Sequence, residues 1–457
     1  MLATYAQKRV IIGLGNTGLS CARYFNRLQL PFTLIDSRLN PPQLSTFEQE
    51  FPDVPLYLGS FDPQLFQHIT ELIVSPGVNL NDTAIAKAIA KTHAMPIGDI
   101  ELFAKNAQAP IIAITGTNAK GTVTTLVGDM IHASNYTAAV GGNIGKAALD
   151  LLTEPVPDFY VLEISSFQLE TTYSLKPKLS TVLNISPDHL DRHKTLKNYI
   201  ETKQHIYNHC EIAIWNRDDP NTLPSNKFKP KKILSFGLEK IKSASPEFGL
   251  QKSNKAIYLT YGKQLLIPID RLYIKGQHNW ANALAALTIG HAIQLPLDSM
   301  LEALCQFKGL PHRCQWIKEE KGVTWYNDSK ATNVGATLAA LHGLGPAISG
   351  KIVLIAGGLG KKADFSLLCD SAARYVKTAI LIGQDAPLLK KALEKNTLTQ
   401  YACDLSQAIS LAQQAALPGD AVLLSPACAS MDMFKNYGER GNRFIALVTG
   451  KNYYVQS

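Results

Sequence analysis

The stretch IIAITGTNAKGT, residues 111–122, constrains the fold of this chain more than any other segment. An apolar run breaks there into a turn of glycine, lysine and threonine, and a helical pattern follows directly. In such a strand, loop and helix, backbone N–H groups and the helix N-terminus face an anion, and the lysine neutralises phosphate charge. The pattern predicts a phosphate-binding loop; the alternative is an ordinary strand and helix that bind nothing.

Two positions of this loop depart from the usual pattern, in which Gly precedes the lysine and Ser or Thr follows it. Ala119 and Gly121 stand in those places. If position 119 requires a positive φ, its alanine introduces about 1–2 kcal/mol of backbone strain. Gly121 lacks the hydroxyl that usually reaches Mg²⁺, so the neighbouring Thr122 is the expected replacement.

Length and composition indicate a multidomain globular protein. A chain of 457 residues has the length of about three domains, and 46% hydrophobic residues suffice for several cores. No apolar run reaches the roughly 18 residues that cross a bilayer, and no signal-peptide pattern is present, so we expect a cytoplasmic protein without membrane insertion. The seven cysteines are scattered and form no CxxC pair, which favours reduced thiols.

The net charge of +8 is spread along the chain, so it favours small polyanionic substrates such as nucleotides over nucleic acid. The densest basic run, residues 227–232, lies beside two prolines and is predicted to be a solvated loop.

Apolar strands that end in turns or polar residues predict parallel α/β sheets in three consecutive parts. In the first part, a strand over residues 8–13, the turn GLGNTG (13–18), a helix over 19–28 and a strand over 32–36 resemble a dinucleotide-binding βαβ unit. A further strand, 71–74, ends in Ser75-Pro-Gly77.

The second part continues from the phosphate loop with a helix over 123–132 and strands over 159–163 and 179–184. Shorter strands are expected between residues 220 and 267, with turns at Gly237, Gly249 and Gly262, and a helix over 280–293 follows. From about Gly309 a third series has strands over 351–358, 378–383 and 421–425.

Polar residues at successive strand ends are candidates for chemistry. Glu163 closes one strand, and the motif SPDHLDRH, residues 186–193, follows the next; their carboxylates suit Mg²⁺ beside a phosphate loop, although surface acids or helix caps are the alternative. Lys203 lies on a predicted helix, where an exposed lysine is the ordinary expectation. Arg313 and the group 327–333 also fit simple turns, but Lys330 and Thr332 follow the apolar run 323–326.

Taken together, these segments resemble the Mur ligases, and the likeness runs from Val10 to about Phe444. Within that family, SSFQLE and NDSKATN are typical of the member that adds D-glutamate to UDP-N-acetylmuramoyl-L-alanine (UDP-MurNAc-L-alanine). The motifs that carry the resemblance are TGTN-x-K (115–120), GGNIG (141–145), LEISSFQLE (162–170), DHLDR (188–192), GQHN with Asn282 (276–282), LPHR (310–313), NDSKATN (327–333) and LSPACAS-x-DMF (424–434).

The resemblance implies an α/β protein of three domains. A Rossmann-like domain over residues 1–98 would bind UDP, and a central P-loop ATPase-type domain with a parallel sheet over 99–308 would bind ATP. A C-terminal Rossmann-like domain over 309–457 would bind D-glutamate and contact ATP. The expected partners are these three small-molecule substrates, with Mg²⁺, and we expect a monomer.

The resemblance also implies a role for individual residues. Catalytic roles fall to Lys120, Glu163, His189, Lys203 and Lys330. The residues expected to bind ATP are Gly116, Thr117, Asn118, Ala119, Lys120, Gly121, Thr122, Asn279, Asn282, Arg313 and Asp328. Those expected to bind the UDP-sugar are Asn16, Thr17, Asp36, Ser37, Arg38, Gly77, Asn143, Ser165 and Gln168. D-Glutamate would meet Thr332, Lys361, Ser430 and Tyr437, and Mg²⁺ would meet Thr122, Glu163, His189 and a carbamylated Lys203.

The implied reaction passes through an acyl phosphate and releases ADP and phosphate. Tyr437 replaces a Phe and Leu359 replaces an acid of the family pattern. Two other functions remain open: an NAD(P)-dependent oxidoreductase, which rests on the glycines of residues 13–18 and Asp36, and a non-catalytic UDP-sugar binding protein with an impaired ATP loop. Glu163, Lys203 and Lys330 argue against the latter, since a binding protein does not need them.

Overall fold

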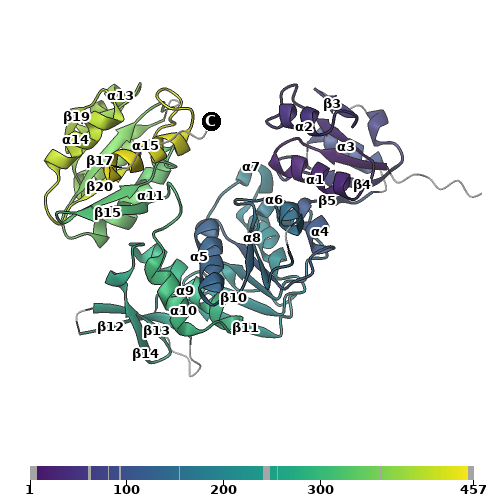
Figure 1. The fold of residues 1–457 in the computed structure, drawn as a ribbon, viewed down its shortest axis with the longest axis horizontal. Coiled ribbons are helices and arrows are strands. Elements are labelled where there is room, and N and C mark those ends of the chain that lie inside the picture. Colours follow the sequence, from purple (N-terminus) through teal and green to yellow (C-terminus); the bar gives the residue numbers. More distant parts are fainter. Residues whose placement is uncertain are drawn as a thin grey trace, which may run out of the picture. The chain divides into compact units, whose positions relative to one another are not determined.

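The computed structural model describes residues 8–59, 63–80, 82–91, 94–153, 155–239, 247–254, 256–360 and 363–450. The described strands form three sheets, in which parallel pairs predominate, and the predicted α/β fold class is confirmed (Figure 1). The chain divides into two compact units. The first comprises Met1–Lys252, Leu259–Leu266 and Asn282–Ala303, and the second Ser253–Tyr258, Ile267–Ala281 and Leu304–Ser457.

The first sheet has five parallel strands in the order β3-β2-β1-β4-β5. Helix α1 begins at Asn16, three residues before the predicted start, because Gly18 lets its first turn approach the end of β1; a Cβ there would lie 1.9 Å from the Gly13 carbonyl oxygen. The elements of this part are β1 (Lys8–Ile12), α1 (Asn16–Arg27), β2 (Phe32–Asp36), α2 (Leu44–Glu50), β3 (Leu56–Leu58), η1 (Pro63–Phe66), β4 (Ile69–Val74), α3 (Thr83–Lys91) and β5 (Pro96–Ile97).

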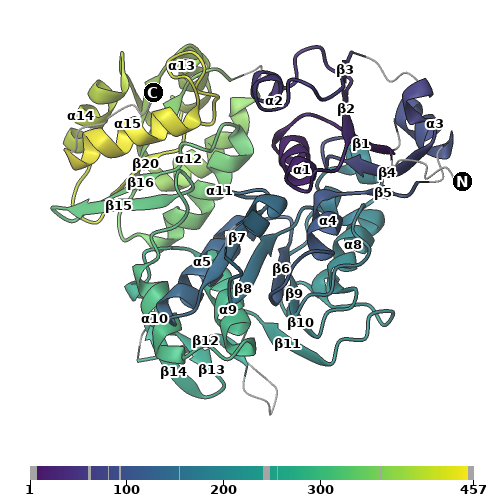
Figure 2. The same cartoon turned by 45° about the vertical axis from the view of Figure 1, so that its right-hand side comes forward.

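The central sheet has nine strands in the order β14-β13-β12-β11-β10-β9-β6-β8-β7. Helix α5 packs against β7 and β8 (Figure 2). Its elements are α4 (Asp99–Ala104), β6 (Ile111–Thr115), α5 (Lys120–Ala133), β7 (Ala138–Gly142), η2 (Ala148–Thr153), β8 (Phe159–Glu163), α6 (Ser166–Leu169), β9 (Leu179–Val182), α7 (Leu190–His193), α8 (Leu196–Gln204), η3 (His205–Tyr207), β10 (Ile212–Asn216), η4 (Pro220–Thr222), β11 (Lys232–Phe236), β12 (Phe248–Ser253), β13 (Ala256–Tyr261), β14 (Gln264–Pro268), η5 (Ile269–Arg271), α9 (Gln277–Ala292) and α10 (Leu297–Gln306).

Two expectations for the central part are corrected. Gly249 lies inside β12 rather than in a turn, and its carbonyl oxygen accepts a hydrogen bond from Thr260 in β13, so strand pairing overrides the local preference of glycine. Strand β9 ends at Val182, not at residue 184, because Asn184 bonds to the phosphate loop instead of continuing the ladder.

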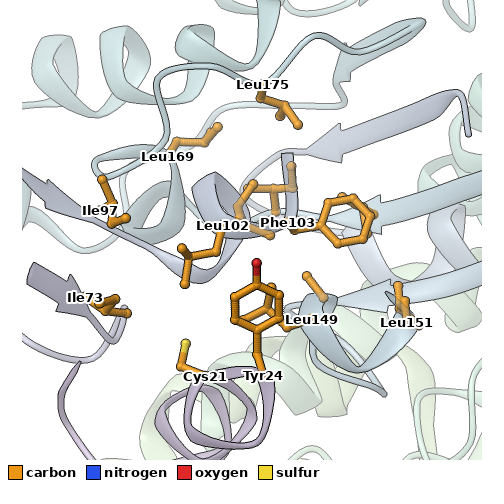
Figure 3. Close-up of a cluster of buried hydrophobic side chains, with 14 of the residues drawn as sticks. Cys21, Tyr24, Ile73, Ile97, Leu102, Phe103, Leu149, Leu151, Leu169 and Leu175 are labelled. Carbon is orange, nitrogen blue, oxygen red and sulfur yellow. The ribbon is translucent and has the colours of Figure 1, made fainter. Parts of the chain in front are cut away.

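One hydrophobic core joins the first sheet to the central sheet (Figure 3). Cys21 and Tyr24 of α1 and Ile73 of β4 lie against Leu102 and Phe103 of α4, and the ring of Phe103 meets Tyr160 of β8 edge to face. This cluster extends to η2 and to the segment after α6, so the two sheets share buried apolar surface.

The third sheet has the order β15-β16-β20-β17-β18-β19 and is parallel except for β15. Alternate residues of β17 enter two different cores, with Leu354 on one face and Ile355 on the other, as expected for a sheet buried on both sides. Its elements are β15 (Gln315–Glu320), β16 (Val323–Asn327), α11 (Val334–Leu344), η6 (Gly345–Ala347), β17 (Ile352–Gly357), η7 (Phe365–Leu368), α12 (Cys369–Tyr375), β18 (Val376–Ile382), α13 (Ala386–Leu393), β19 (Leu398–Tyr401), α14 (Leu405–Ala415), β20 (Ala421–Leu424) and α15 (Tyr437–Thr449).

Within the described ranges, no helix has the length and apolar character that crossing a membrane requires.

Candidate active site

The predicted phosphate loop joins the fully buried strand β6 to helix α5. Ala119, the last residue before the helix, has φ 64° and ψ 0°, which is the left-handed conformation. The predicted positive φ at this position is confirmed, and an alanine there carries about 1–2 kcal/mol of strain that a glycine would not. Gly121 and Thr122 lie in the first turn of α5, both partly exposed.

Lys120 folds back over this loop. Its Nζ donates hydrogen bonds to the carbonyl oxygens of Gly116 and Thr117, at 3.0 and 3.1 Å. The lysine is partly exposed, and Asn118 at the tip of the loop is exposed, so the charge lies at the surface where a phosphate can reach it.

Lys203 on α8 is buried, with 1% of its surface exposed, so the alternative of an ordinary exposed helix lysine is wrong. Its Nζ donates to the carbonyl oxygen of Gly116 at 2.8 Å and to the hydroxyl of Thr115 at 3.3 Å. Burial, reinforced by the charge of Lys120, lowers the pKa of Lys203 to about 7. A large fraction of this amine is therefore neutral at physiological pH.

Residues after β9 also contact the loop, and the sequence motifs indicated Ser186 but neither Asn184 nor Tyr199. The Asn184 side chain accepts from the Asn118 N–H at 2.8 Å and donates to its carbonyl oxygen at 3.2 Å. The Thr117 hydroxyl lies 3.2 Å from the Tyr199 hydroxyl and accepts from the Ser186 N–H. The only sequence signal for Asn184 is its place just beyond a strand that neighbours β6.

Glu163 closes β8, is 5% exposed, and accepts a hydrogen bond from the Asn143 side chain at 2.7 Å. His189 is exposed, with a ring nitrogen 3.5 Å from the Asp188 carboxylate and its ring centroid 4.8 Å from that of Phe167. Among the described residues, no three His, Cys, Asp or Glu side chains gather as a metal site.

The first-sheet residues expected to bind UDP lie near the carboxyl ends of β1, β2 and β4. Both Asp36 oxygens are engaged: Oδ2 accepts from the Leu14 N–H at 2.7 Å, and the Arg38 guanidinium bonds to both. Burial raises the pKa of Asp36, but these hydrogen bonds outweigh it and leave the pKa lowered. Asn16, Ser37 and Gly77 are exposed and Thr17 is partly exposed.

Ser165 and Gln168 form a capping box at α6. Gln168 is 2% exposed, and protein groups engage both ends of its amide: Oε1 accepts from Ser165, and Nε2 donates to the Asp99 carboxylate at 3.0 Å. Ser165 is partly exposed.

In the second unit, Asp328 follows β16 and is 8% exposed. It accepts from the Ser425 hydroxyl at 2.7 Å and from the Cys314 N–H at 3.0 Å. Burial raises the pKa of Asp328 to about 7, against the opposing effect of these donors and of Arg313. Arg313 itself is exposed.

Lys330 is exposed, and its Nζ lies 5.4 Å from the centroid of the Tyr437 ring. Thr332 is partly exposed and Ser430 is buried. Lys361 lies outside the described residues.

A buried arginine connects the loop that carries Lys330 to the loop that carries Ser430. Arg440 of α15 donates to the hydroxyl and carbonyl oxygen of Ser329 at 3.0 and 2.9 Å, and to the carbonyl oxygen of Cys428 at 3.2 Å. Helix α9 carries the two remaining candidates, Asn279 and Asn282, one helical turn apart; the Asn279 amide donates to the Lys275 carbonyl oxygen.

Family models match all three sheets in turn. The Mur ligase MurD-like N-terminal domain matches residues 7–96, the Mur ligase middle domain residues 114–290, and the Mur ligase glutamate ligase domain residues 312–428. Among solved structures, the UDP-N-acetylmuramate-alanine ligase of Thermotoga maritima is similar with a TM-score of 0.58 and 16% identity, covering 97% of this chain and 99% of that one. The MurF ligase of Thermotoga maritima in complex with ADP has a TM-score of 0.57 and 15% identity, covering 98% and 96%.

Curated relatives are much nearer in sequence. The UDP-N-acetylmuramoylalanine–D-glutamate ligase of Coxiella burnetii (strain Dugway 5J108-111) is 49% identical over 442 residues, which is 96% of this chain and 98% of the relative. The ligase of the same name from Legionella pneumophila (strain Lens) is 46% identical over 443 residues, 96% of this chain and 98% of the relative. With matches of this extent, the chain belongs to the Mur ligase family.

Proposed function

We propose that this protein is an ATP-dependent ligase that joins D-glutamate to UDP-MurNAc-L-alanine in peptidoglycan precursor synthesis, releasing ADP and phosphate. The observation that carries the proposal is the 49% identity over nearly the full length to a ligase whose name states those two substrates. The oxidoreductase alternative finds no support in the comparisons. Its key acid, Asp36, is already bonded by Arg38 and the Leu14 N–H.

The reaction proceeds in two steps. The alanyl carboxylate oxygen attacks the γ-phosphorus of ATP, the bond to the bridging oxygen breaks, and ADP leaves. The amine of D-glutamate then attacks the carbonyl carbon of the acyl phosphate, phosphate departs, and the nitrogen loses a proton as the amide forms. Both transition states place negative charge on oxygens, so fixed cations and N–H donors at those positions accelerate both steps.

In the first unit, we assign phosphate binding to the loop 116–122. Lys120 would turn from its carbonyl partners to the phosphates, which are stronger acceptors because they are charged. Residues 1–98 would hold the UDP part of the sugar substrate, with Asp36 keeping the Arg38 guanidinium at the end of β2.

The residues also fit a magnesium ion, and a modified Lys203 would add a ligand to it. Glu163 supplies a carboxylate, Thr122 a hydroxyl and His189 an imidazole, and Lys203 has the lowered pKa that leaves its amine free to react with carbon dioxide. The resulting carbamate would supply an anionic ligand in addition to Glu163. The ion would neutralise the phosphate oxygens as charge develops on them.

In the second unit, we assign ATP contacts to Arg313 and Asp328 and D-glutamate contacts to Thr332, Ser430, Tyr437 and Lys361. Lys330, exposed beside the Tyr437 ring, carries a charge suited to a carboxylate or phosphate. Arg440 acts on this set indirectly, because it holds Ser329 and Cys428, each within two residues of an assigned side chain.

The test is a coupled ADP-release assay with ATP, UDP-MurNAc-L-alanine and either enantiomer of glutamate. We expect turnover to require both the nucleotide sugar and D-glutamate, with L-glutamate a poor substitute. Equal turnover with L-glutamate, or without any amino acid, would refute the proposal.

We further propose a cytoplasmic location, because two of the three proposed substrates are nucleotides and all seven cysteines are unpaired. That the enzyme is a monomer stays a prediction, which analytical ultracentrifugation measures.

A further inference from the structure

Helix α4 connects the first sheet to the central sheet and presents two buried acids to the segment 165–174. Asp99 and Glu101 are 1% and 3% exposed. Asp99 contacts the beginning of that segment and Glu101 its end, where the Tyr173 and Ser174 N–H groups each donate to Glu101 Oε2 at 2.8 Å. Between them, the Gly98 N–H donates to the Thr171 carbonyl oxygen at 3.0 Å. The α4 segment thus clamps a stretch that starts two residues after Glu163.

A chain of hydrogen bonds leads from Asp99 to Ser165. Gln168 Nε2 donates to Asp99 Oδ2 at 3.0 Å, and Gln168 Oε1 accepts from the Ser165 N–H and hydroxyl at 3.0 and 3.1 Å. The backbone N–H of Gln168 also donates to the Ser165 hydroxyl oxygen, at 3.2 Å, so Ser165 and Gln168 bond to each other in both directions.

The hydrogen-bonding groups at the two ends of this series, the Ser165 N–H and the Asp99 carboxylate, fix the orientation of the Gln168 amide. A backbone N–H only donates, so the amide oxygen must face Ser165. An ionised carboxylate only accepts, so the amide nitrogen must face Asp99. A flipped amide would lose both contacts at once.

The orientation in turn fixes what Ser165 can offer to a ligand. Its hydroxyl hydrogen is committed to Gln168 Oε1, and one lone pair accepts the Gln168 N–H. One lone pair remains, on a side chain that is partly exposed while Gln168 is buried. Ser165 therefore meets a bound ligand as a hydrogen-bond acceptor.

We propose that Asp99 is a positioning residue for UDP-sugar binding, acting through the Gln168 amide to hold the Ser165 hydroxyl as an acceptor for a hydroxyl or amide N–H of that substrate. The inference rests on the proposed function, since it takes the ligand of Ser165 to be the nucleotide sugar. Burial raises the pKa of Asp99 to about 6, against the opposing hydrogen bond from Gln168, so the carboxylate is mainly ionised at neutral pH.

The decisive test exchanges the acid and the amide. Gln168→Glu places two carboxylates in contact, and we expect it to weaken binding of UDP-MurNAc-L-alanine by about tenfold or more, measured by calorimetry. Adding Asp99→Asn supplies an amide donor to the new carboxylate at position 168, whose other oxygen still accepts from Ser165. The double variant should bind the nucleotide sugar within about threefold of the unmodified protein. Mg-ATP affinity should stay constant in all variants.

Glu101→Gln is the matched control, because it changes an equally buried acid on the same helix that holds the far end of the same segment. It should lower the melting temperature and leave nucleotide-sugar affinity within about twofold. The proposal is overturned if the double variant binds no better than Gln168→Glu alone, or if Glu101→Gln weakens binding as much as Gln168→Glu does. Failure of the unmodified protein to bind UDP-MurNAc-L-alanine would instead refute the proposed function.

Discussion

The Nζ atom of Lys203 lies 2.8 Å from the carbonyl oxygen of Gly116, a residue 87 positions earlier in the chain. This contact buries the Lys203 amine against the phosphate loop. On an isolated helix α8, the same amine would be in solvent. Burial disfavours the charged amine, and the nearby charge of Lys120 disfavours it further, so the pKa of Lys203 is lowered. Conversion of the amine to a carbamate would replace the repulsion between two cations by attraction between opposite charges.

Lys203→Ala should therefore reduce turnover by at least about a hundredfold, and added short-chain carboxylates should restore part of it by replacing the anion near the proposed magnesium ion. The measurement is ADP release at saturating substrates with and without the carboxylate. Lys197→Ala is the control, because Lys197 lies on the same helix with its side chain 83% exposed. Full activity of unsupplemented Lys203→Ala would contradict the assignment.

The left-handed Ala119 and the missing hydroxyl at Gly121 predict a loop that binds Mg-ATP less tightly than it could. The pair of substitutions Ala119→Gly and Gly121→Ser should tighten Mg-ATP binding by about tenfold for each 1.4 kcal/mol recovered. Affinity for UDP-MurNAc-L-alanine should change little, because its assigned residues lie outside the loop. Calorimetric titration of both ligands checks both expectations.

Thr122→Ala tests whether that hydroxyl has taken over the metal contact. It should be more harmful to ATP affinity and turnover in the natural background than in the Ala119→Gly, Gly121→Ser background, where a second hydroxyl is present. Equal losses in the two backgrounds would show that Thr122 does not substitute for a residue at position 121.

Asp99 should make stability depend on pH. Its pKa is raised from 3.8 to about 6, so the folded state binds the proton more tightly than the unfolded state. Protonated Asp99 therefore adds about 3 kcal/mol to the free energy of unfolding below about pH 4. This contribution is lost as pH rises through about 6.

Urea unfolding of the natural protein and of Asp99→Asn between pH 4 and 7.5 measures this contribution. The natural protein should lose stability relative to the variant across that interval. Glu101, whose pKa is lowered, has the opposite dependence, but it is present in both proteins and cancels. If the two proteins differ in unfolding free energy by the same amount at every pH, Asp99 ionises in the folded state as easily as in the unfolded state.

Asp36 should matter for the nucleotide sugar and for no other ligand. Asp36→Ala frees the Arg38 guanidinium and the Leu14 N–H, so we expect binding of UDP-MurNAc-L-alanine to weaken about tenfold while Mg-ATP affinity is unchanged. Glu50→Ala, which breaks an exposed pair with Arg23 in the same part of the chain, is the control. NADH should not bind to the natural protein. A saturable enhancement of NADH fluorescence on titration with the protein would instead support the oxidoreductase alternative.

The sequence predicted the parts of the site that depend on local chain geometry. Strand ends, the turn at the phosphate loop and the positive φ at Ala119 all follow from residue type and spacing over a few positions. The burial of Lys203 could not be obtained in this way, because it depends on where α8 meets a loop almost 90 residues earlier.

The supporting contacts around the site were missed for the same reason. Asn184 and Asn118 are 66 residues apart, and Gln168 and Asp99 are 69 apart, so no periodicity connects them. Gln168 illustrates the limit: its motif marked it as a substrate contact, while its burial and its two protein partners come only from the tertiary structure.

Because of the shared core in Figure 3, the parts of the chain before and after residue 98 should not unfold independently. A fragment ending there would expose Cys21, Tyr24 and Ile73, which have no other core to enter, whereas the third sheet has cores of its own on both faces. Amide protons of the central strands should thus exchange more slowly when the nucleotide sugar is bound without ATP, because the two sheets open in one cooperative event. If the nucleotide sugar binds as proposed, its binding would stabilise the phosphate loop against unfolding before ATP binds.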